Sequence, residues 1–373
     1  MRVLYLLDTT DRAESEAIIE LARRGVTATV VCSPEAPMRG RLEAAGMEVI
    51  PLRLRSKADP RAIRALRRLR RERGFDLVHA LYKIALTNYN LAALGLPRVP
   101  VVAYRGIIGN LSYADPFSWL SFLDPRIERI ICVCEAIRQY FLHKRLLPGV
   151  TLFRPERVVT IHKGHRAAWY EQEDARLPED LALPPQAPVI GCIARLKGRK
   201  GIVELIRAFE QLPEALGAHL LLVGPVADRR ITRAVRESPA SGRIHLTGYR
   251  RDAARIAGAL DVQVLPSLRR EGLPRAIIEG MAQRVPPIVS DAGGSPELVE
   301  DGISGRVVPA GEVTALRDAL SELAGDAALR ARMGAAARER IEHGFSIDRT
   351  VEQTLAVYGE VVGQREITER EAR

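Results

Sequence analysis

Short runs of apolar and β-branched residues alternate with helical patterns along this chain, and the alternation is built twice. Seven runs in the first half have the strand pattern: RVLYLL, VTATVVC, EVIPL, DLVHAL, VPVVAYR, RIICVC and RVVTIH. Six runs in the second half share it: VIGCIAR, HLLLVG, IHLTG, VQVLPS, PPIVSD and GRVVP. Near-continuous apolar strands separated by helices predict parallel sheets that are covered on both faces. We therefore expect an α/β protein with two doubly wound domains in tandem.

The 373 residues suffice for two domains, each with its own core. We place an N-terminal domain at 1–170, an acidic, proline-rich linker at 171–187 and a C-terminal domain at 188–345. An amphipathic helix at 346–363 is expected to pack back on the first domain, and the charged residues 364–373 are expected to fray. Doubly wound sheets bind ligands beyond the carboxyl ends of their strands. The expected active site is therefore a cleft between two facing sheets.

Composition narrows the class of protein. No stretch approaches the roughly 18 apolar residues of a membrane span, and Asp8 comes too early for a signal peptide. Cys32, Cys132, Cys134 and Cys192 lie in apolar runs without metal-ligand spacing, so we expect reduced, buried thiols in a cytoplasmic protein. The net charge of +10 is concentrated in the first half, which suggests an anionic partner there.

The segment REGLPRAIIEGM, residues 270–281, places a carboxylate, a turn and a helix start in succession. Pro274 suits the first position of a helix, and the amides that follow it have no intrahelical acceptor. Gly272 allows another group to approach that backbone closely. The segment therefore predicts a seat for an anion such as a phosphate. The alternative is a capped surface helix in which Arg275 and Glu279 form an i,i+4 pair.

Two further segments of the second half support the anion seat. VIGCIARLKGRKG sets Arg195 and Lys200 after a strand, where a planar guanidinium and a mobile ammonium could share a diphosphate. SDAGGSPELVEDG adds a flexible turn at Gly293 and Gly294.

ARLKGRKG, REGLPRAIIEGMA and VSDAGGSPELVEDGISGRVVP, in this order, resemble glycosyltransferase family 4. Glu271 and Glu279 match the family's two glutamates separated by seven residues. The resemblance covers residues 188–362 and is looser over 1–170, where RIICVCEAIRQYFL and VVTIHKGH still fit. It implies the GT-B fold of two facing Rossmann-like domains and a retaining transfer from a nucleotide-diphosphate sugar, without a metal or other cofactor.

The resemblance also implies roles for single residues. Glu271 would contact the sugar hydroxyls, Glu279 the ribose, and Arg195 with Lys200 the diphosphate. The implied catalytic residues are Glu271, Arg195, Lys200 and Arg105. The implied donor-binding residues are Glu279, Gly272, Leu273, Pro274, Arg275, Gly248, Tyr249 and Gly224.

The first half departs from the family pattern. Arg105 stands where many members carry a histidine that faces the donor sugar, and arginine cannot act as a base. The family's glycine-rich turn after the first strand is replaced by LLDTTDRAE. Asp8 and Thr9 there are candidates for acceptor contact, although a helix cap by Thr10 or Asp11 explains the segment equally well.

The loop HKGH, residues 162–165, follows a strand at the expected edge of the cleft. Lys163 and His165 are therefore further candidates for acceptor contact. No third ligand has suitable spacing, so no metal site is expected. His79 is interpreted as a partly buried residue at the end of a strand.

Residues 53–73 contain ten Arg or Lys. The segment is either a solvated covering helix or a contact for anionic lipid headgroups. Phe117, Trp119 and Phe122 are either core or a lipid-facing edge. No nucleic-acid-binding motif accompanies the charge. Together these features favour a glycan or lipid-linked acceptor, in bacterial surface polysaccharide or lipopolysaccharide synthesis at the inner face of the membrane. The alternatives are a sugar-nucleotide epimerase and a catalytically silent nucleotide-sugar-binding or scaffolding subunit.

Overall fold

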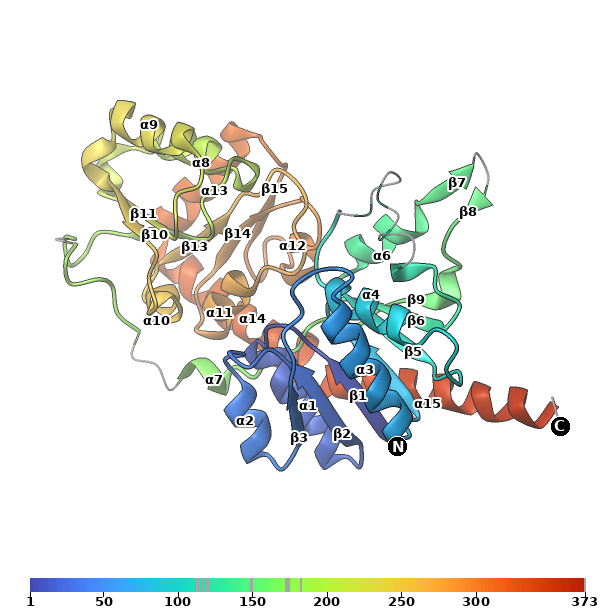
Figure 1. The fold of residues 1–373 in the computed structure, drawn as a ribbon. Helices are drawn as coiled ribbons and strands as arrows, with labels where there is room; N and C mark the ends of the chain where they lie inside the picture. Colours follow the sequence, from blue (N-terminus) through green and yellow to red (C-terminus); the bar gives the residue numbers. More distant parts are fainter. Residues whose placement is uncertain are drawn as a thin grey trace. The chain divides into compact units, whose positions relative to one another are not determined.

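The computed structural model describes residues 1–109, 111, 115, 117, 121–147, 150–171, 175–181 and 183–371, with 146–147 and 364–371 described by their backbone alone. The chain forms two compact units (Figure 1). Unit 1 comprises Met1–Gly164 and Ile347–Arg373, and unit 2 comprises His165–Ser346. The chain therefore passes from unit 1 to unit 2 after residue 164. The sequence patterns had predicted the end of the first domain at 170 and a linker at 171–187.

Unit 1 is built on a seven-stranded sheet of order β3-β2-β1-β4-β5-β6-β9 in which every neighbouring pair is parallel. Its strands are β1 (Arg2–Leu6), β2 (Thr27–Cys32), β3 (Glu48–Pro51), β4 (Leu77–Ala80), β5 (Val101–Arg105), β6 (Ile127–Cys132) and β9 (Val158–Thr160). All seven strands coincide with the predicted runs. The sequence patterns did not reveal the short antiparallel ladder of β7 (Arg145–Leu147) and β8 (Val150–Thr151).

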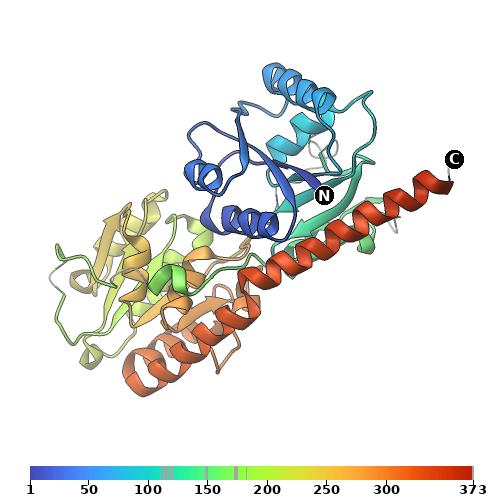
Figure 2. The ribbon, with the colours of Figure 1, turned by 90° about the horizontal axis from the view of Figure 1, so that it is seen from below.

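Helices flank this sheet in packed pairs. They are α1 (Arg12–Arg23), α2 (Arg39–Ala44), α3 (Pro60–Glu72), α4 (Lys83–Ala92), α6 (Glu135–Leu142) and α15 (Ile347–Glu371), with a 3₁₀ turn η1 (Pro155–Arg157). α3 packs on α4, and α15 packs on α1 and β6 (Figure 2). Tyr358 on α15 reaches the sheet, where its hydroxyl lies 2.6 Å from His79 Nδ1. The last helix of the chain is therefore part of the core of unit 1.

Local chemistry explains where these helices begin and end. Asp11 caps α1 by accepting a hydrogen bond from the Glu14 amide at 2.8 Å, which leaves Thr10 to accept one from the Met38 amide. Gly25 follows the end of α1 with a φ of 94°, a left-handed conformation that favours glycine at the end of a helix. Asp59 caps α3.

The arginines of α3 divide into two groups. Arg67 Nη1 donates to the Ala92 and Leu94 carbonyls, and Arg70 donates to the Pro97 carbonyl. These two side chains therefore bind carbonyls at and beyond the C-terminus of α4, where orphan carbonyls attract cations. The exposed arginines of the helix are Arg61, Arg64, Arg68 and Arg71.

The aromatic segment of unit 1 is in part core. Phe122 is 1% exposed and packs edge-on against Phe141, with ring centroids 5.3 Å apart. Phe117 is half-buried, with Lys57 Nζ 5.5 Å from its ring centroid. Trp119 lies outside the described residues. The lipid-facing alternative is therefore wrong for Phe122.

Unit 2 carries a second parallel sheet, of order β12-β11-β10-β13-β14-β15. Its strands are β10 (Val189–Ile193), β11 (His219–Val223), β12 (Ile244–Gly248), β13 (Val262–Leu265), β14 (Pro287–Ser290) and β15 (Arg306–Val308). All six coincide with the predicted runs. The interior strands are buried along nearly their whole length, as parallel strands covered on both faces require.

The helices of unit 2 alternate with these strands. They are α7 (Ala168–Glu171), α8 (Ile202–Phe209), α9 (Arg229–Glu237), α10 (Ala253–Gly258), α11 (Arg275–Ala282), α12 (Ser295–Leu298), α13 (Val313–Gly325) and α14 (Ala327–Gly344), with 3₁₀ turns η2 (Gly198–Lys200), η3 (Glu214–Leu216) and η4 (Ser241–Arg243). α13 packs on α8, and α11 packs on α10 and α14. The four cysteines of the chain are buried and unbridged, as expected.

Candidate functional site

The candidate site in unit 2 lies where the strand order of the sheet reverses. The chain passes from β10 outward to β11 and β12, and then returns to β13 on the other side of β10. In such sheets the loops after the two central strands diverge and leave a crevice beyond their carboxyl ends. Arg195 and Lys200 follow β10, and Glu271 follows β13. The sheet topology thus brings together residues about seventy positions apart.

Lys200 and Glu271 form a buried ion pair at this crevice. Lys200 Nζ lies 2.6 Å from Glu271 Oε2, and their side chains are 11% and 10% exposed. Ser267, on the turn after β13, donates from its hydroxyl to the same oxygen at 2.7 Å, and Arg199 Nη1 lies 4.0 Å from it. Glu271 Oε1 has no hydrogen bond to any described residue. The pair therefore holds one carboxylate oxygen in place and leaves the other available to a ligand.

The backbone around Glu271 is packed tightly. Arg270 has a φ of 58°, a left-handed conformation that is uncommon for arginine and that recurs at functional sites. The Glu271 carbonyl accepts a hydrogen bond from the Gly294 amide at 3.1 Å. A Cβ added to Gly293, whose φ is 65°, would lie 2.1 Å from that carbonyl oxygen. The double glycine therefore lets the loop after β14 close on the backbone of Glu271.

Helix α11 begins directly after this loop. The helix starts at Arg275, and Pro274 is its N-cap residue. The sequence predicted Pro274 as the first helical residue, so the helix begins one residue later than predicted. No side chain caps this end, so the first amides have no intrahelical acceptor. The apolar face of α11 is buried through Ile277, Ile278 and Met281.

Glu279 lies off the buried face of α11 and is half-buried. Arg275 Nε is 3.0 Å from Glu279 Oε1, so the i,i+4 pair forms in the free protein. A ribose contact for Glu279 would add to this pair or replace it. Gly272 and Leu273 lie in the loop between Glu271 and the helix.

The remaining donor candidates lie on the neighbouring loops. Arg195 is exposed, and no ion pair or hydrogen bond joins its side chain to another described residue. Gly224 has a φ of 132°, and an added Cβ would lie 1.9 Å from the Ala194 carbonyl oxygen. Its amide donates to the Gly248 carbonyl at 2.8 Å. Tyr249 is 73% exposed. Gly224 therefore has a packing role, and Arg195 and Tyr249 are open to solvent.

The predicted acceptor residues do not share one environment. Asp8 and Thr9 follow β1 beside the point where strand order reverses between β1 and β4, and the Thr9 hydroxyl lies 3.1 Å from that of Tyr82, which follows β4. Partial burial raises the pKa of Asp8. His165 belongs to unit 2, is 2% exposed and has Nδ1 2.7 Å from the Tyr170 hydroxyl. Its geometry indicates a structural role.

Lys163 is held between two carboxylates. Its Nζ lies 2.6 Å from Asp11 Oδ2 and 2.7 Å from Glu14 Oε1, and it faces the ring of Tyr104. Burial alone would lower the pKa of Lys163, but these neighbours raise it well above the usual value. Lys163 is therefore a charged link between the loop after β9 and the start of α1.

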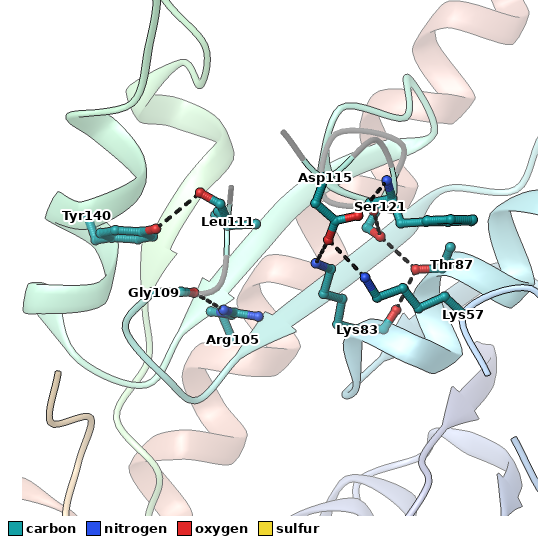
Figure 3. A network of polar contacts seen from close by, with 10 residues as sticks. Lys57, Lys83, Thr87, Arg105, Gly109, Leu111, Asp115, Ser121 and Tyr140 are labelled. Atoms are coloured by element: carbon teal, nitrogen blue, oxygen red, sulfur yellow. Dashed lines mark hydrogen bonds and ion pairs between the residues drawn. The ribbon is translucent and has the colours of Figure 1, made fainter. Parts of the chain in front are cut away.

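Arg105 ends β5 and is 4% exposed. Its Nε donates to the Ile107 carbonyl at 3.0 Å, and Nη2 donates to the Gly109 carbonyl (Figure 3). Burial lowers the pKa of the guanidinium. Among the described residues no carboxylate lies within ion-pair distance of it.

Sequence patterns missed the partners of these residues. Ser267 follows a proline just after β13, and this position at the carboxyl end of a strand could have indicated that it belongs to the site. Lys83 and Asp115 carried no motif, Lys57 was noted only as part of the basic segment 53–73, and the association of the three is visible only in the fold. In the described part of the chain, no three His, Cys, Asp or Glu side chains are grouped as metal ligands. Within that part, too, each helix is too short or too polar to cross a membrane.

Comparison with known proteins places the chain in a family. The model for Glycosyltransferase Family 4 matches residues 16–166, and the model for Glycosyl transferases group 1 matches residues 173–340. N-acetyl-alpha-D-glucosaminyl L-malate synthase of Bacillus anthracis is 25% identical over 195 residues, 52% of this chain and 51% of that protein. Lipopolysaccharide core biosynthesis glycosyltransferase LpsE of Rhizobium meliloti is 30% identical over 167 residues, 44% of this chain and 48% of that protein. The matches thus span about half the length of these curated relatives.

The fold is shared over nearly the whole chain with a solved structure. HepE of Anabaena, determined in complex with UDP, superposes with a TM-score of 0.76 at 21% identity, covering 96% of this chain and all of that one. The two Rossmann-like units are those of the GT-B fold. Two family models in succession and a common fold lead to one conclusion: the chain belongs to the family 4, or group 1, glycosyltransferases.

Proposed function

We propose that the chain is a retaining glycosyltransferase that moves a sugar from a nucleotide-diphosphate sugar to a glycan or lipid-linked acceptor. The observation that carries the proposal is the Lys200–Glu271 pair at the carboxyl ends of β10 and β13. A cation beside a buried carboxylate with one open oxygen suits a ligand in which a sugar is joined to a diphosphate.

Unit 2 supplies the donor site in this proposal. Lys200 and Arg195 bind the diphosphate, together with the uncapped amides at the start of α11. Lys200 retains donors for a phosphate oxygen, because an ammonium carries three and one is directed to Glu271. Glu271 Oε1 accepts hydrogen bonds from the sugar hydroxyls, and Glu279 accepts them from the ribose.

The reaction then requires no protein nucleophile. The bond between the anomeric carbon and the diphosphate oxygen breaks, and the acceptor oxygen bonds to that carbon on the same face. The acceptor's proton passes to the departing phosphate oxygen. Lys200, Arg195 and the helix terminus stabilise the charge that develops on the leaving diphosphate, so that a metal ion is not required. Such charge-assisted hydrogen bonds contribute about 1.5–3 kcal/mol each.

The relatives support a bacterial surface-glycan setting. LpsE is named for lipopolysaccharide core biosynthesis, and the HepE structure contains UDP. We place the enzyme on the cytoplasmic side of the membrane, with the exposed arginines of α3 against anionic headgroups. Each basic residue near such a surface contributes about 1 kcal/mol.

A donor screen tests the proposal. Full-length protein is melted with UDP-, GDP- and ADP-sugars, and we expect one of them to raise the melting temperature by mass action. Incubation of that donor with bacterial lipid and glycan extracts should yield free nucleoside diphosphate and a glycoside that retains the anomeric configuration. No stabilisation by any donor at millimolar concentration would contradict the donor site. An inverted product would contradict the mechanism.

The membrane contact has a separate test. Wild type and an Arg64→Gln/Arg68→Gln/Arg71→Gln variant are pelleted with anionic and with neutral vesicles. We expect the wild type to pellet with anionic vesicles alone and the variant to remain in the supernatant. Equal pelleting of both proteins would show that α3 is not the contact.

A further inference from the structure

A cluster of cations in unit 1 is unexplained by the donor chemistry. Lys57 precedes α3, Lys83 is the first residue of α4 and Arg105 is the last residue of β5. Asp115 Oδ2 lies 2.9 Å from Lys57 Nζ and 3.4 Å from Lys83 Nζ (Figure 3). The loop before α3 and the start of α4 thus meet at a single carboxylate.

The charges of this cluster do not balance. Asp115 is the only acidic residue between positions 105 and 121, and it forms ion pairs with Lys57 and Lys83. Arg105 is not paired with Asp115, but its charge acts on Lys83. Burial lowers the pKa of Lys83, Asp115 opposes that shift, and Lys57 with Arg105 adds to it. Lys57, Lys83, Arg105 and Asp115 together carry a charge of about +2, which the charge of about −1.5 to −2 on a phosphate monoester at neutral pH would balance.

Arg105 is the member that most needs an anion. A buried charge without a counter-ion is costly, because carbonyl dipoles replace only part of its hydration. Its Nε and Nη2 bind carbonyls, while Nη1 has no hydrogen bond to a described residue. A guanidinium fork with an open nitrogen matches the geometry of phosphate oxygens.

The start of α4 adds to the attraction. Tyr82 is the N-cap residue of this ten-residue helix, and it forms no capping hydrogen bond. The first amides of α4 therefore carry partial positive charge at the position of Lys83. Asp115 already places one carboxylate oxygen between the two lysines, which shows that the cluster accommodates an anion.

We propose that Lys83 and Arg105, assisted by Lys57, bind a phosphate group on the acceptor. The inference rests on the proposed function, in which unit 1 carries the acceptor. It gives Arg105 the role of orienting the acceptor by a fixed anion, in place of acid–base chemistry at the donor sugar. The phosphate belongs either to a phosphorylated sugar of the growing glycan or to an isoprenoid carrier.

Binding of small phosphates by the full-length protein tests the inference. Calorimetric titrations compare glucose 6-phosphate with glucose and geranyl phosphate with geraniol, so that each phosphate has a neutral partner. The donor site is occupied by saturating nucleoside diphosphate in one series and weakened by Lys200→Ala in a second. We expect one phosphate to bind at least about tenfold more tightly than its neutral partner, because charge-assisted hydrogen bonds are gained. Which phosphate binds identifies its source.

The variants locate the site. Arg105→Gln and Lys83→Gln should each weaken the phosphate about tenfold and leave the nucleoside diphosphate unaffected. Arg98→Gln is the matched control, because Arg98 is an exposed arginine before the other end of β5, and it should bind both ligands as wild type does. Where Arg105→Gln fails to fold, Arg105→Lys and Lys83→Gln carry the test.

Other outcomes would overturn the inference. Equal binding of phosphates and neutral partners, or unchanged phosphate binding by the variants, would remove the site. Loss of nucleoside diphosphate binding in Arg105→Gln would assign Arg105 to the donor. Failure of wild type to bind any nucleotide would instead count against the proposed function, and the Lys200→Ala series would still report on the phosphate.

Discussion

The two sheets of this protein differ in how charge is balanced beyond their carboxyl edges. In unit 2, one lysine meets one carboxylate, and Lys200 with Glu271 forms a pair that the Ser267 hydroxyl holds in place. In unit 1, Arg105 is buried without a carboxylate partner among the described residues. The first arrangement is complete before a ligand arrives, whereas the second has a positive excess.

A third arrangement in unit 1 sharpens this comparison. Lys163 pairs with both Asp11 and Glu14, so this cluster has one positive and two negative groups. This cluster joins α1 to the loop after β9 and requires no ligand. The comparison teaches that burial and charge alone do not mark a binding site. What separates the structural lysine from the proposed anion site is the sign of the residual charge.

The largest effect is expected for Glu271→Gln. The amide cannot form the ion pair with Lys200, and it is a weaker acceptor for sugar hydroxyls. We expect turnover to fall at least 100-fold while the fold survives, on the order of one or two charge-assisted hydrogen bonds. Release of nucleoside diphosphate measures it, with a thermal melt to report folding. Glu237→Gln, an exposed change on α9, serves as the control, and wild-type turnover in Glu271→Gln would refute the role of Glu271.

Gly293→Ala tests the packing that fixes Glu271. Its Cβ would collide with the Glu271 carbonyl oxygen in a backbone conformation that alanine disfavours. We expect a loss of about 3 kcal/mol in the free energy of unfolding, from overpacking and backbone strain together. Gly217→Ala is the matched control, since Gly217 has a similar φ of 57° with no atom within 4 Å. A denaturant titration that gave equal losses for both would show that the contact is unimportant.

Lys163→Met tests the structural lysine. Removing the cation takes away the ammonium that Asp11 and Glu14 share, and we expect a loss of about 2 kcal/mol in the free energy of unfolding. Addition of Glu14→Gln should restore part of that loss, because one of the two repelling carboxylates is gone. A single variant as stable as wild type would mean that the three groups are not coupled.

The smallest effect is an acid sensitivity confined to unit 1. Burial lowers the pKa of His79 to about 3, so the folded chain keeps this ring neutral while the unfolded chain takes up a proton below about 6.5. Stability contributed by the neutral ring is therefore present above the unfolded pKa and is lost as the pH falls from there towards 3.

Between pH 7 and pH 5.5 this loss amounts to about 1 kcal/mol. His79→Gln should flatten that part of the profile, and hydrogen exchange should locate the change in unit 1. His143→Gln, at an exposed position, should leave the profile as it is. A slope that persisted in His79→Gln would assign the acid sensitivity to other groups.

The sequence predicted the architecture well, because parallel strands read as short apolar runs between helices. Thirteen such runs became strands. Lys200 and Glu271 were expected at the same edge of the sheet because strand ends meet there, but their ion pair was not predicted. The predicted start of α11 was wrong by one residue, because only the backbone angles of Pro274 decide whether it is the N-cap residue or the first helical residue.

The contacts of unit 1 could not be predicted in the same way. Lys163 pairs with Glu14, which is 149 residues away in sequence, and Lys57 pairs with Asp115, which is 58 residues away. No rule of sequence spacing predicts either pair. The basic pattern of residues 53–73 did not reveal that Arg67 and Arg70 point inward to carbonyls. Such side-chain choices depend on packing between elements and are visible only in the folded chain.

The central claim is that the crevice beyond β10 and β13 holds a nucleotide-diphosphate sugar. A crystal structure with the nucleoside diphosphate found by the donor screen tests it most directly. The account predicts that a phosphate oxygen lies within hydrogen-bond distance of Lys200 Nζ while Glu279 contacts the ribose. A nucleotide bound away from Lys200 and Glu271 would contradict it.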